Sequence, residues 1–283
     1  MSLMSVSPSA HVTSRGESSQ LTPHTPNDSY PNILDSVTFS MSQDSVIPLE
    51  SNPEIFTQFG RKLGLSPLLS FFDVFSLTDP DLVSFLPRPV YALILLFPLT
   101  TLYESLKLSE EKGRDQEKDD KFEQIIWFKQ LLRNGCGLYG LLHALCNLPE
   151  GLLVKDSPIE AFIHKVKHLP DVNNSNNHGE KSKLVKDLSL SLYETFSKQG
   201  QTEAPSSEEE VNLHFICFTK GTDGHFYELD GRRNGPVDLG QAEPESDAIS
   251  SQLVLQRVQR YMSLADEDNS MNFAMIALGP DLG

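Results

Sequence analysis

The stretch FKQLLRNGCGLYGLLHALC, residues 128–146, contains a cysteine between a polar turn and a long apolar run. Helical apolar spacing on both sides of the turn at 133–135 predicts two helices, over 122–132 and 136–148. Cys136 then lies in the first turn of a helix, where free N–H groups and the helix dipole stabilise a thiolate. The flanking glycines leave room for a substrate backbone. Cys136 is therefore a candidate nucleophile, although a lone cysteine is more commonly a small buried hydrophobe.

The same glycines, Gly135, Gly137 and Gly140, match the G-x-G-x-x-G pattern of dinucleotide-binding loops, and Asp156 lies near the spacing of its acidic residue. That pattern requires a preceding β-strand and a βαβ unit. The residues before Gly135 instead have helical spacing, which disfavours a nucleotide-binding oxidoreductase. We expect no cofactor.

His143 and Cys146 lie three residues apart on the same predicted helix. Two such ligands without a third or fourth are weak evidence for a metal, and helix packing explains them better. We expect no metal site.

Residues 213–229 predict a β-hairpin, with two strand-like stretches on either side of the turn residues 221–224. A turn centred on Thr222 places His214 directly opposite Asp230, with Cβ atoms about 5 Å apart and within reach of a hydrogen bond. A turn centred later would shift this register. Taken singly, the histidine is more commonly a core residue and the aspartate a turn residue. Together they supply the base and the orienting acceptor that a cysteine nucleophile needs.

In the rest of the chain, predicted helices and predicted strands alternate irregularly, which favours an α/β or α+β fold. Asn52 is predicted to cap a helix with Pro53 in its first turn, and further helices are predicted over 76–85, 159–167 and 184–196. Buried strands are predicted over 90–97 and 272–278. The highly charged stretch 104–120 and the Asn-rich stretch 171–182 are both predicted to be mobile surface loops.

The chain has 283 residues, with 39 Asp and Glu against 23 Lys and Arg, a net charge of −16. This balance disfavours nucleic acid as a partner, because phosphate contacts need clustered cations. The longest apolar stretch, 91–99, is too short for a membrane span, so no membrane partner is expected. Three cysteines, an odd number without a CxxC pair, indicate a reducing compartment. We expect a cytoplasmic protein, with the nucleus as a further site.

Residues 1–45 contain 12 serines, one Arg and no Lys. Their few large apolar side chains cannot offset the entropy of ordering, so the segment is predicted to be a disordered tail. It has the features of neither a mitochondrial transit peptide nor a secretory signal. Residues 46–283 could form one or two domains on length alone.

Several segments of this body, taken in order, resemble the ubiquitin C-terminal hydrolase family of cysteine proteases (peptidase family C12), and most closely its small fungal members. They are PLESNPE (48–54), LPRPV (86–90), FKQ to NGCG (128–137), GQTEAP (200–205), LHFI (213–216) and YELDGR (227–232). The resemblance implies one catalytic domain over 46–283. It also implies a papain-like α/β fold, with a central antiparallel sheet flanked by helices and a knotted backbone, which is rare among proteins.

By this resemblance, Cys136 is the nucleophile, His214 is the general base and acid, and Asp230 orients the imidazole. Gln130, six residues before the cysteine, donates its side-chain amide to the oxyanion, with the N–H of Cys136 as second donor. The interval from His214 to Asp230 is one residue longer than the family pattern, and we place the extra residue in the hairpin turn.

The implied substrate is ubiquitin or a close ubiquitin-like modifier, cleaved at its C-terminal glycine. Glu50, Glu54 and Asp73 match positions at which family members contact ubiquitin. The segment 193–211 crosses the active site in the family, which favours small or unfolded leaving groups. We expect a monomer. The alternative from another class is a ubiquitin-binding module that has lost its chemistry.

Overall fold

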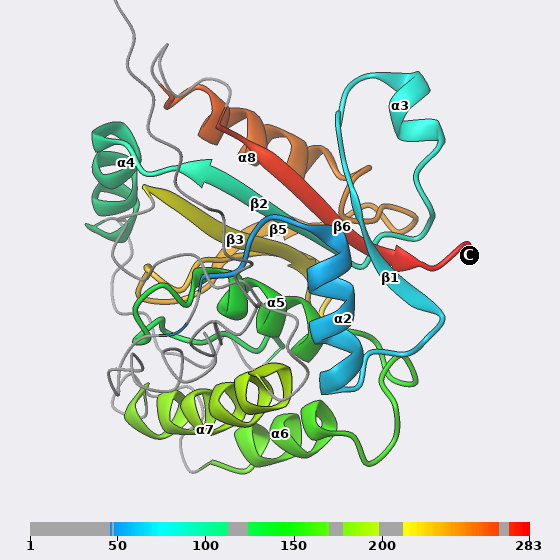
Figure 1. The fold of residues 1–283 in the computed structure, drawn as a ribbon. Coiled ribbons are helices and arrows are strands. Elements are labelled where there is room, and N and C mark those ends of the chain that lie inside the picture. The colour runs from blue at the N-terminus through cyan, green and yellow to red at the C-terminus, as the bar shows by residue number, and fades with distance from the viewer. Residues whose placement is uncertain (1–45, 47, 113–123, 170–177, 198–211, 266–271) are drawn as a thin grey trace, which may run out of the picture.

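The computed structural model describes residues 46, 48–112, 124–169, 178–197, 212–265 and 272–283. The predicted tail 1–45 lies outside these residues. The described chain builds one six-stranded sheet with helices on both faces (Figure 1). The strand order is β1-β6-β2-β3-β4-β5, and every neighbouring pair is antiparallel. The predicted papain-like α/β architecture is therefore confirmed, whereas the predicted knot depends on the path of every connecting segment and stays a prediction.

The strands are β1 (Leu69–Asp73), β2 (Ala92–Pro98), β3 (Leu213–Lys220), β4 (His225–Leu229), β5 (Val237–Gln241) and β6 (Ala274–Pro280). The helices are α2 (Pro53–Leu63), α3 (Pro80–Ser84), α4 (Thr101–Lys112), α5 (Cys136–Cys146), α6 (Pro158–Lys167), α7 (His178–Ser197) and α8 (Gln252–Met262). None of the helices in the described ranges has the length and apolar character needed to cross a bilayer.

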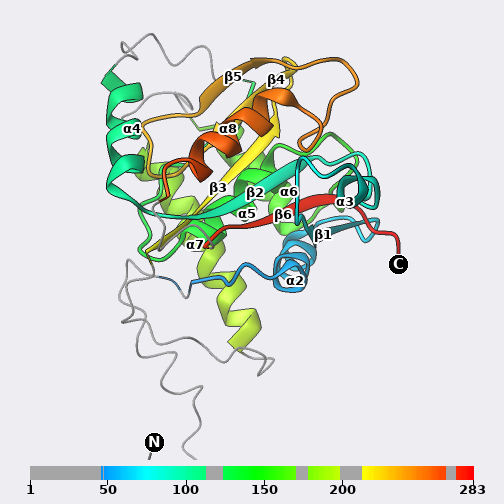
Figure 2. The ribbon, with the colours of Figure 1, turned by 90° about the horizontal axis from the view of Figure 1, so that it is seen from above.

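Both faces of the central strands are buried, as predicted for 90–97. Side chains alternate between the two faces of a strand. Ile94 and Cys217 belong to the core under α2, α5, α6 and α7, whereas Leu95 and Phe218 belong to the core under α8. Figure 2 shows α8 lying over the strands, with α5, α6 and α7 on the far side. The sheet therefore separates two apolar cores.

The first helix begins as its sequence predicts. The side chain of Asn52 accepts hydrogen bonds from the backbone N–H groups of Glu54 (2.9 Å) and Ile55 (3.3 Å). Pro53 occupies the first turn, where it loses no hydrogen bond. Phe56, Phe59 and Leu63 then face the core.

Some predicted elements are wrong. The stretch 104–120 was predicted to be a loop, but its part up to Lys112 belongs to helix α4. The remaining part, 113–120, lies outside the described residues. Residues 124–132 contain no helix; they run extended or in turns up to the start of α5. The Asn-rich loop ends earlier than predicted, since α7 begins at His178, and the helix predicted over 76–85 is only α3.

Candidate active site

The structure brings Cys136, His214 and Asp230 together from three elements. Cys136 is the first residue of α5, a helix whose other residues are all buried and which packs against β3. His214 is the second residue of β3. Asp230 directly follows β4 and opens a turn in which the N–H of Arg233 donates to its carbonyl oxygen (3.1 Å).

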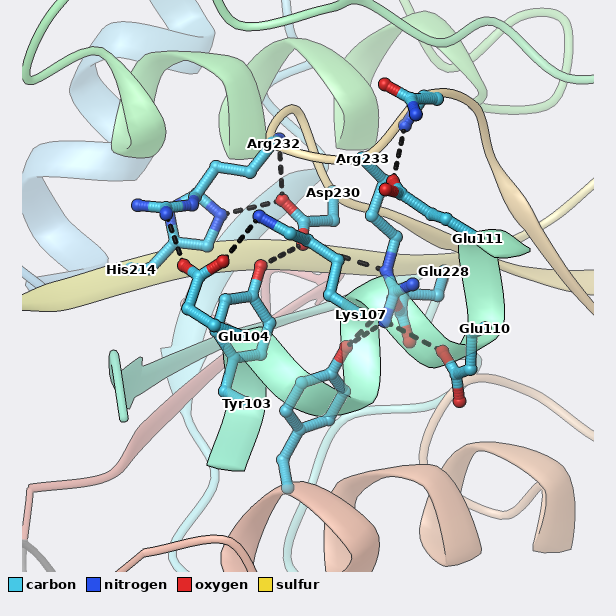
Figure 3. A network of polar contacts seen from close by, with 12 residues as sticks. Tyr103, Glu104, Lys107, Glu110, Glu111, His214, Glu228, Asp230, Arg232 and Arg233 are labelled. Carbon is cyan, nitrogen blue, oxygen red and sulfur yellow. Dashed lines mark hydrogen bonds and ion pairs between the residues drawn. The ribbon is translucent and has the colours of Figure 1, made fainter. Parts of the chain in front are cut away.

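The imidazole of His214 and the carboxylate of Asp230 form a buried pair. His214 Nε2 donates to Asp230 Oδ1 over 2.7 Å, and the exposed fractions of the two residues are 2% and 0% (Figure 3). The backbone N–H of Arg232 donates to the same oxygen over 2.8 Å, and Tyr103 Oη donates to Oδ2 over 2.7 Å. A carboxylate with this many donors is stabilised as an anion.

The pKa values of the two groups follow from this arrangement. Burial favours neutral forms, but the charge and hydrogen bond of His214 hold the pKa of Asp230 well below its usual range. Burial also opposes the charge on His214, yet the charge of Asp230 raises the pKa of His214 to about 9. The pair therefore exists as imidazolium and carboxylate at neutral pH.

Cys136 is half-buried and faces the imidazole. Burial alone would raise the pKa of its thiol. The hydrogen bond and charge of His214, with the backbone N–H groups of Phe215 and Gly137, outweigh burial and lower the pKa. A thiolate next to an imidazolium is the reactive state of a cysteine nucleophile. The other cysteines, Cys146 and Cys217, are buried in apolar surroundings that raise their thiol pKa values.

Gln130 lies against the turn that follows Asp230. Its backbone N–H donates to the carbonyl oxygen of Gly231 over 2.9 Å, and its side-chain amide donates to the carbonyl oxygen of Leu132 over 3.3 Å. A Cβ on Gly231 would lie 2.7 Å from the Cβ of Gln130, so this approach requires glycine. The role of Gln130 as oxyanion donor stays a prediction.

Two residues close to Gln130 in the chain hold the same turn, and no motif or spacing indicated them. Trp127 Nε1 donates to the carbonyl oxygen of Asp230 over 3.0 Å. Lys129 Nζ donates to the carbonyl oxygens of Arg232 (3.2 Å) and Arg233 (2.7 Å). Segment 127–130 and the turn after Asp230 therefore form one bonded unit, which the predicted helix over 122–132 could not have formed.

His143 has the packing role that its spacing predicts. It is buried, its Nε2 accepts the N–H of Phe128 over 3.1 Å, and burial lowers its pKa to about 3. Among the residues that the structure describes, no group of three or more His, Cys, Asp and Glu side chains could hold a metal ion. The context that a dinucleotide loop requires is also missing from the described residues, because the sheet strands are antiparallel and residues 124–135, which precede α5, form none of these strands.

The space beside Gly137 is filled by the chain itself, rather than left open for a substrate backbone as predicted. A Cβ on Gly137 would lie 2.8 Å from the Cβ of Leu49 and 3.4 Å from the ring of Phe215. The chain's own residue Leu49 therefore occupies the room that was expected for a substrate backbone. Gly137 is needed so that the segment before α2 can cross the start of α5.

The three predicted ubiquitin contacts are exposed. Glu50 precedes α2, Glu54 lies in its first turn and Asp73 ends β1. Their carboxylates are available to a partner, and their roles stay predictions. Most of the predicted crossover segment, residues 198–211, lies outside the described residues.

Comparison with known proteins agrees with this geometry. The family model described as ubiquitin carboxyl-terminal hydrolase, family 1 (peptidase C12), matches residues 46–263. The chain is 40% identical over 242 residues to ubiquitin carboxyl-terminal hydrolase YUH1 of Saccharomyces cerevisiae, which covers 84% of this chain and 97% of the yeast protein. It is 32% identical over 232 residues to a ubiquitin carboxyl-terminal hydrolase of Drosophila melanogaster, with 82% and 96% covered.

The fold also matches a crystal structure, that of the Trichinella spiralis UCH37 catalytic domain bound to ubiquitin vinyl methyl ester. The TM-score is 0.62 at 17% sequence identity, and the match covers 85% of this chain and 99% of the other. The resemblance drawn from the sequence motifs is thus confirmed. The chain belongs to family 1 of the ubiquitin carboxyl-terminal hydrolases and is an enzyme of the cysteine-type deubiquitinating class.

Proposed function

We propose that this enzyme hydrolyses ester, thioester, amide and peptide bonds at the C-terminal glycine of ubiquitin or a close ubiquitin-like modifier. The observation that carries the proposal is the His214–Asp230 pair, which supports a thiolate on Cys136. The names of the relatives point to the same substrate.

In the first half-reaction, the Cys136 thiolate attacks the carbonyl carbon of the terminal glycine. Charge develops on the carbonyl oxygen, which the N–H of Cys136 and the side-chain amide of Gln130 stabilise. The imidazolium of His214 then gives its proton to the leaving amine, alcohol or thiol as the bond breaks, and a thioester on Cys136 remains.

In the second half-reaction, His214 takes a proton from water, and the resulting hydroxide attacks the thioester carbonyl. The carbon–sulfur bond breaks, which returns the thiolate and imidazolium and releases the carboxylic acid, and this acid loses its proton to water to become the free carboxylate. Asp230 keeps the imidazole in the orientation that both half-reactions need, as the third member of a triad does on unrelated folds.

The substrate preference follows from charge and from the crossover segment. Glu50, Glu54 and Asp73 are exposed carboxylates that can pair with a basic C-terminal tail. If the segment 193–211 crosses the active site, as the family resemblance implies, small or unfolded leaving groups are favoured. We propose that the enzyme works as a monomer in the cytoplasm, and also in the nucleus, where free thiols such as that of Cys136 persist.

A fluorogenic amide of ubiquitin tests the proposal. The wild-type protein should release the fluorophore, and Cys136→Ala should lose turnover by at least about 10³-fold while it still binds ubiquitin. Cys217→Ala is the matched control, since its buried thiol should leave turnover unchanged. A ubiquitin that carries a C-terminal electrophile should label Cys136. Saturable ubiquitin binding without fluorophore release would instead identify the alternative, a binding module.

A further inference from the structure

Tyr103 connects α4 to the acid of the triad. It is the buried residue of α4, and its hydroxyl donates to Asp230 Oδ2 over 2.7 Å (Figure 3). Its ring packs against Phe97, at 5.0 Å between centroids, and Tyr261, at 6.0 Å, and these two rings also contact each other at 4.7 Å. Because the Tyr103 ring is fully buried in this aromatic cluster, its hydroxyl is held in place. Burial and the neighbouring Asp230 raise the pKa of Tyr103, which keeps the hydroxyl protonated as a donor.

The two oxygens of Asp230 have different partners. Oδ1 receives His214 Nε2 and the N–H of Arg232, whereas Oδ2 receives the hydroxyl of Tyr103. Arg233 Nε lies 3.8 Å from Oδ2, too far for a hydrogen bond. Among the described residues, Tyr103 is thus the hydrogen-bond donor that fixes the second oxygen and prevents rotation of the carboxylate.

The rest of α4 is attached to the same region. Its positions 103, 104, 107, 110 and 111 lie along one side of a helix. Glu104 pairs with Arg232, Glu110 lies 2.9 Å from Arg233, and the carboxylate of Glu111 accepts the N–H of Asn234 over 3.0 Å. These contacts hold α4 against the turn 230–234, and Figure 3 shows the helix and the turn side by side. The helix therefore forms a rigid support for Tyr103.

We propose that Tyr103 is a positioning residue of the enzyme, which orients Asp230 so that Asp230 in turn orients His214. This inference rests on the proposed function, since it assigns a role within that reaction. The hydroxyl does not reach the reacting atoms; it acts through the carboxylate. Loss of the hydroxyl lets the carboxylate turn, which weakens the support for the imidazolium and hence for the Cys136 thiolate.

Tyr103→Phe tests the proposal, because it removes the hydroxyl and keeps the ring. We expect kcat for the ubiquitin amide to fall about tenfold with KM unchanged, as for the loss of a hydrogen bond to a charged group. We also expect the midpoint of the pH dependence of Cys136 alkylation by iodoacetamide to move to higher pH. The matched control is Tyr227→Phe, which removes a hydroxyl bonded to Asp223 over the same 2.7 Å at the other end of β4.

A double-mutant cycle with Asp230→Asn separates positioning from general stability. If Tyr103 acts through Asp230, Tyr103→Phe should cost little further activity in the Asp230→Asn background. The proposal is overturned if the activity losses of Tyr103→Phe and Asp230→Asn are fully additive. It is also overturned if Tyr103→Phe lowers the melting temperature but leaves the alkylation midpoint unchanged. Absence of ubiquitin amide hydrolysis in the wild type would refute the proposed function instead, whereas the alkylation midpoint would still report on Tyr103.

Discussion

His214 and Asp230 lie 16 residues apart in the chain, and their side chains meet over 2.7 Å in the interior of the protein. His214 lies on β3, whereas Asp230 directly follows β4, the other strand of the hairpin. The two side chains are only 3% and 0% exposed, so water cannot stabilise either charge. The charge that His214 presents to Cys136 therefore depends on Asp230 and on the other protein groups that contact the pair.

Asp230→Asn should lower kcat for the ubiquitin amide about 100-fold, because a neutral amide stabilises the imidazolium less and permits the wrong tautomer. Steady-state kinetics measure the effect. The matched control is Asp238→Asn, which changes a second His–Asp pair, His225 Nδ1 to Asp238 Oδ1 at 2.9 Å, that is largely exposed and should not affect turnover. Equal losses in both variants would contradict the role of Asp230.

The pH–rate profile should fall at its alkaline end near the raised pKa of His214, about 9. The sign follows from the direction of the shift. His214 is protonated below that pH, and its imidazolium, the acid of the first half-reaction, is lost as pH rises through it. On the acid side, kcat/KM should rise as Cys136 loses its proton, at a pKa below that of an ordinary cysteine.

The same profile in Asp230→Asn provides the check. Since the charge of Asp230 raises the pKa of His214, its removal should move the alkaline limb to lower pH. An alkaline limb that stays in place in the variant would show that another group controls it.

Gln130→Ala should lower kcat about 10²- to 10³-fold with little change in ubiquitin binding, because an oxyanion donor acts mainly in the transition state. Kinetics and binding of the same variant are measured side by side. Gln241→Ala is the control, since its exposed side-chain amide also donates to a backbone carbonyl oxygen, that of Gly224, over 3.2 Å. Unchanged kcat in Gln130→Ala would remove the residue from the mechanism.

The sequence predicted the elements that have an apolar face. Helices α2, α5 and α6, the buried strand β2 and the hairpin all follow from spacing and capping. The Asn52 cap and the buried alternation along 90–97 are examples in which local and tertiary preferences agree. The three proposed triad residues stand out in the sequence because their residue types and the family motifs around them are distinctive.

The elements that the sequence did not predict are held by polar or long-range contacts. The inward side of α4 carries Tyr103, Glu104 and Glu110, so its pattern is that of a solvated segment. Conversely, Ile125, Phe128 and Leu132 have helical spacing, but they belong to a segment without helix and reach the core from there. Partners far along the chain explain that conformation. Trp127 donates to the carbonyl oxygen of Asp230, and His143 and Asn147 accept the backbone N–H groups of Phe128 and Ile126.

The predicted hairpin register was also wrong by two residues. Cys217 pairs with Leu229, which centres the turn on Asp223 rather than Thr222. His214 still reaches Asp230 for two reasons. A shift of two keeps both side chains on the same face of the sheet, and Asp230 has already left the strand and entered the turn.

Arg233→Met should lower the free energy of unfolding by about 3 kcal/mol, because breaking a buried ion pair leaves charge without compensation. The Arg233 side chain is fully buried, and its Nε lies 2.7 Å from Glu228 Oε1, also fully buried. Arg257 contacts both Glu228 and Glu110, so without Arg233 two carboxylates would share one guanidinium. Urea denaturation followed by tryptophan fluorescence gives the change. Arg61→Met is the control, since its exposed pair with Asp281 should contribute less than about 1 kcal/mol. Equal destabilisation of the two variants would show that burial does not determine how much the Arg233–Glu228 pair contributes to the free energy of unfolding.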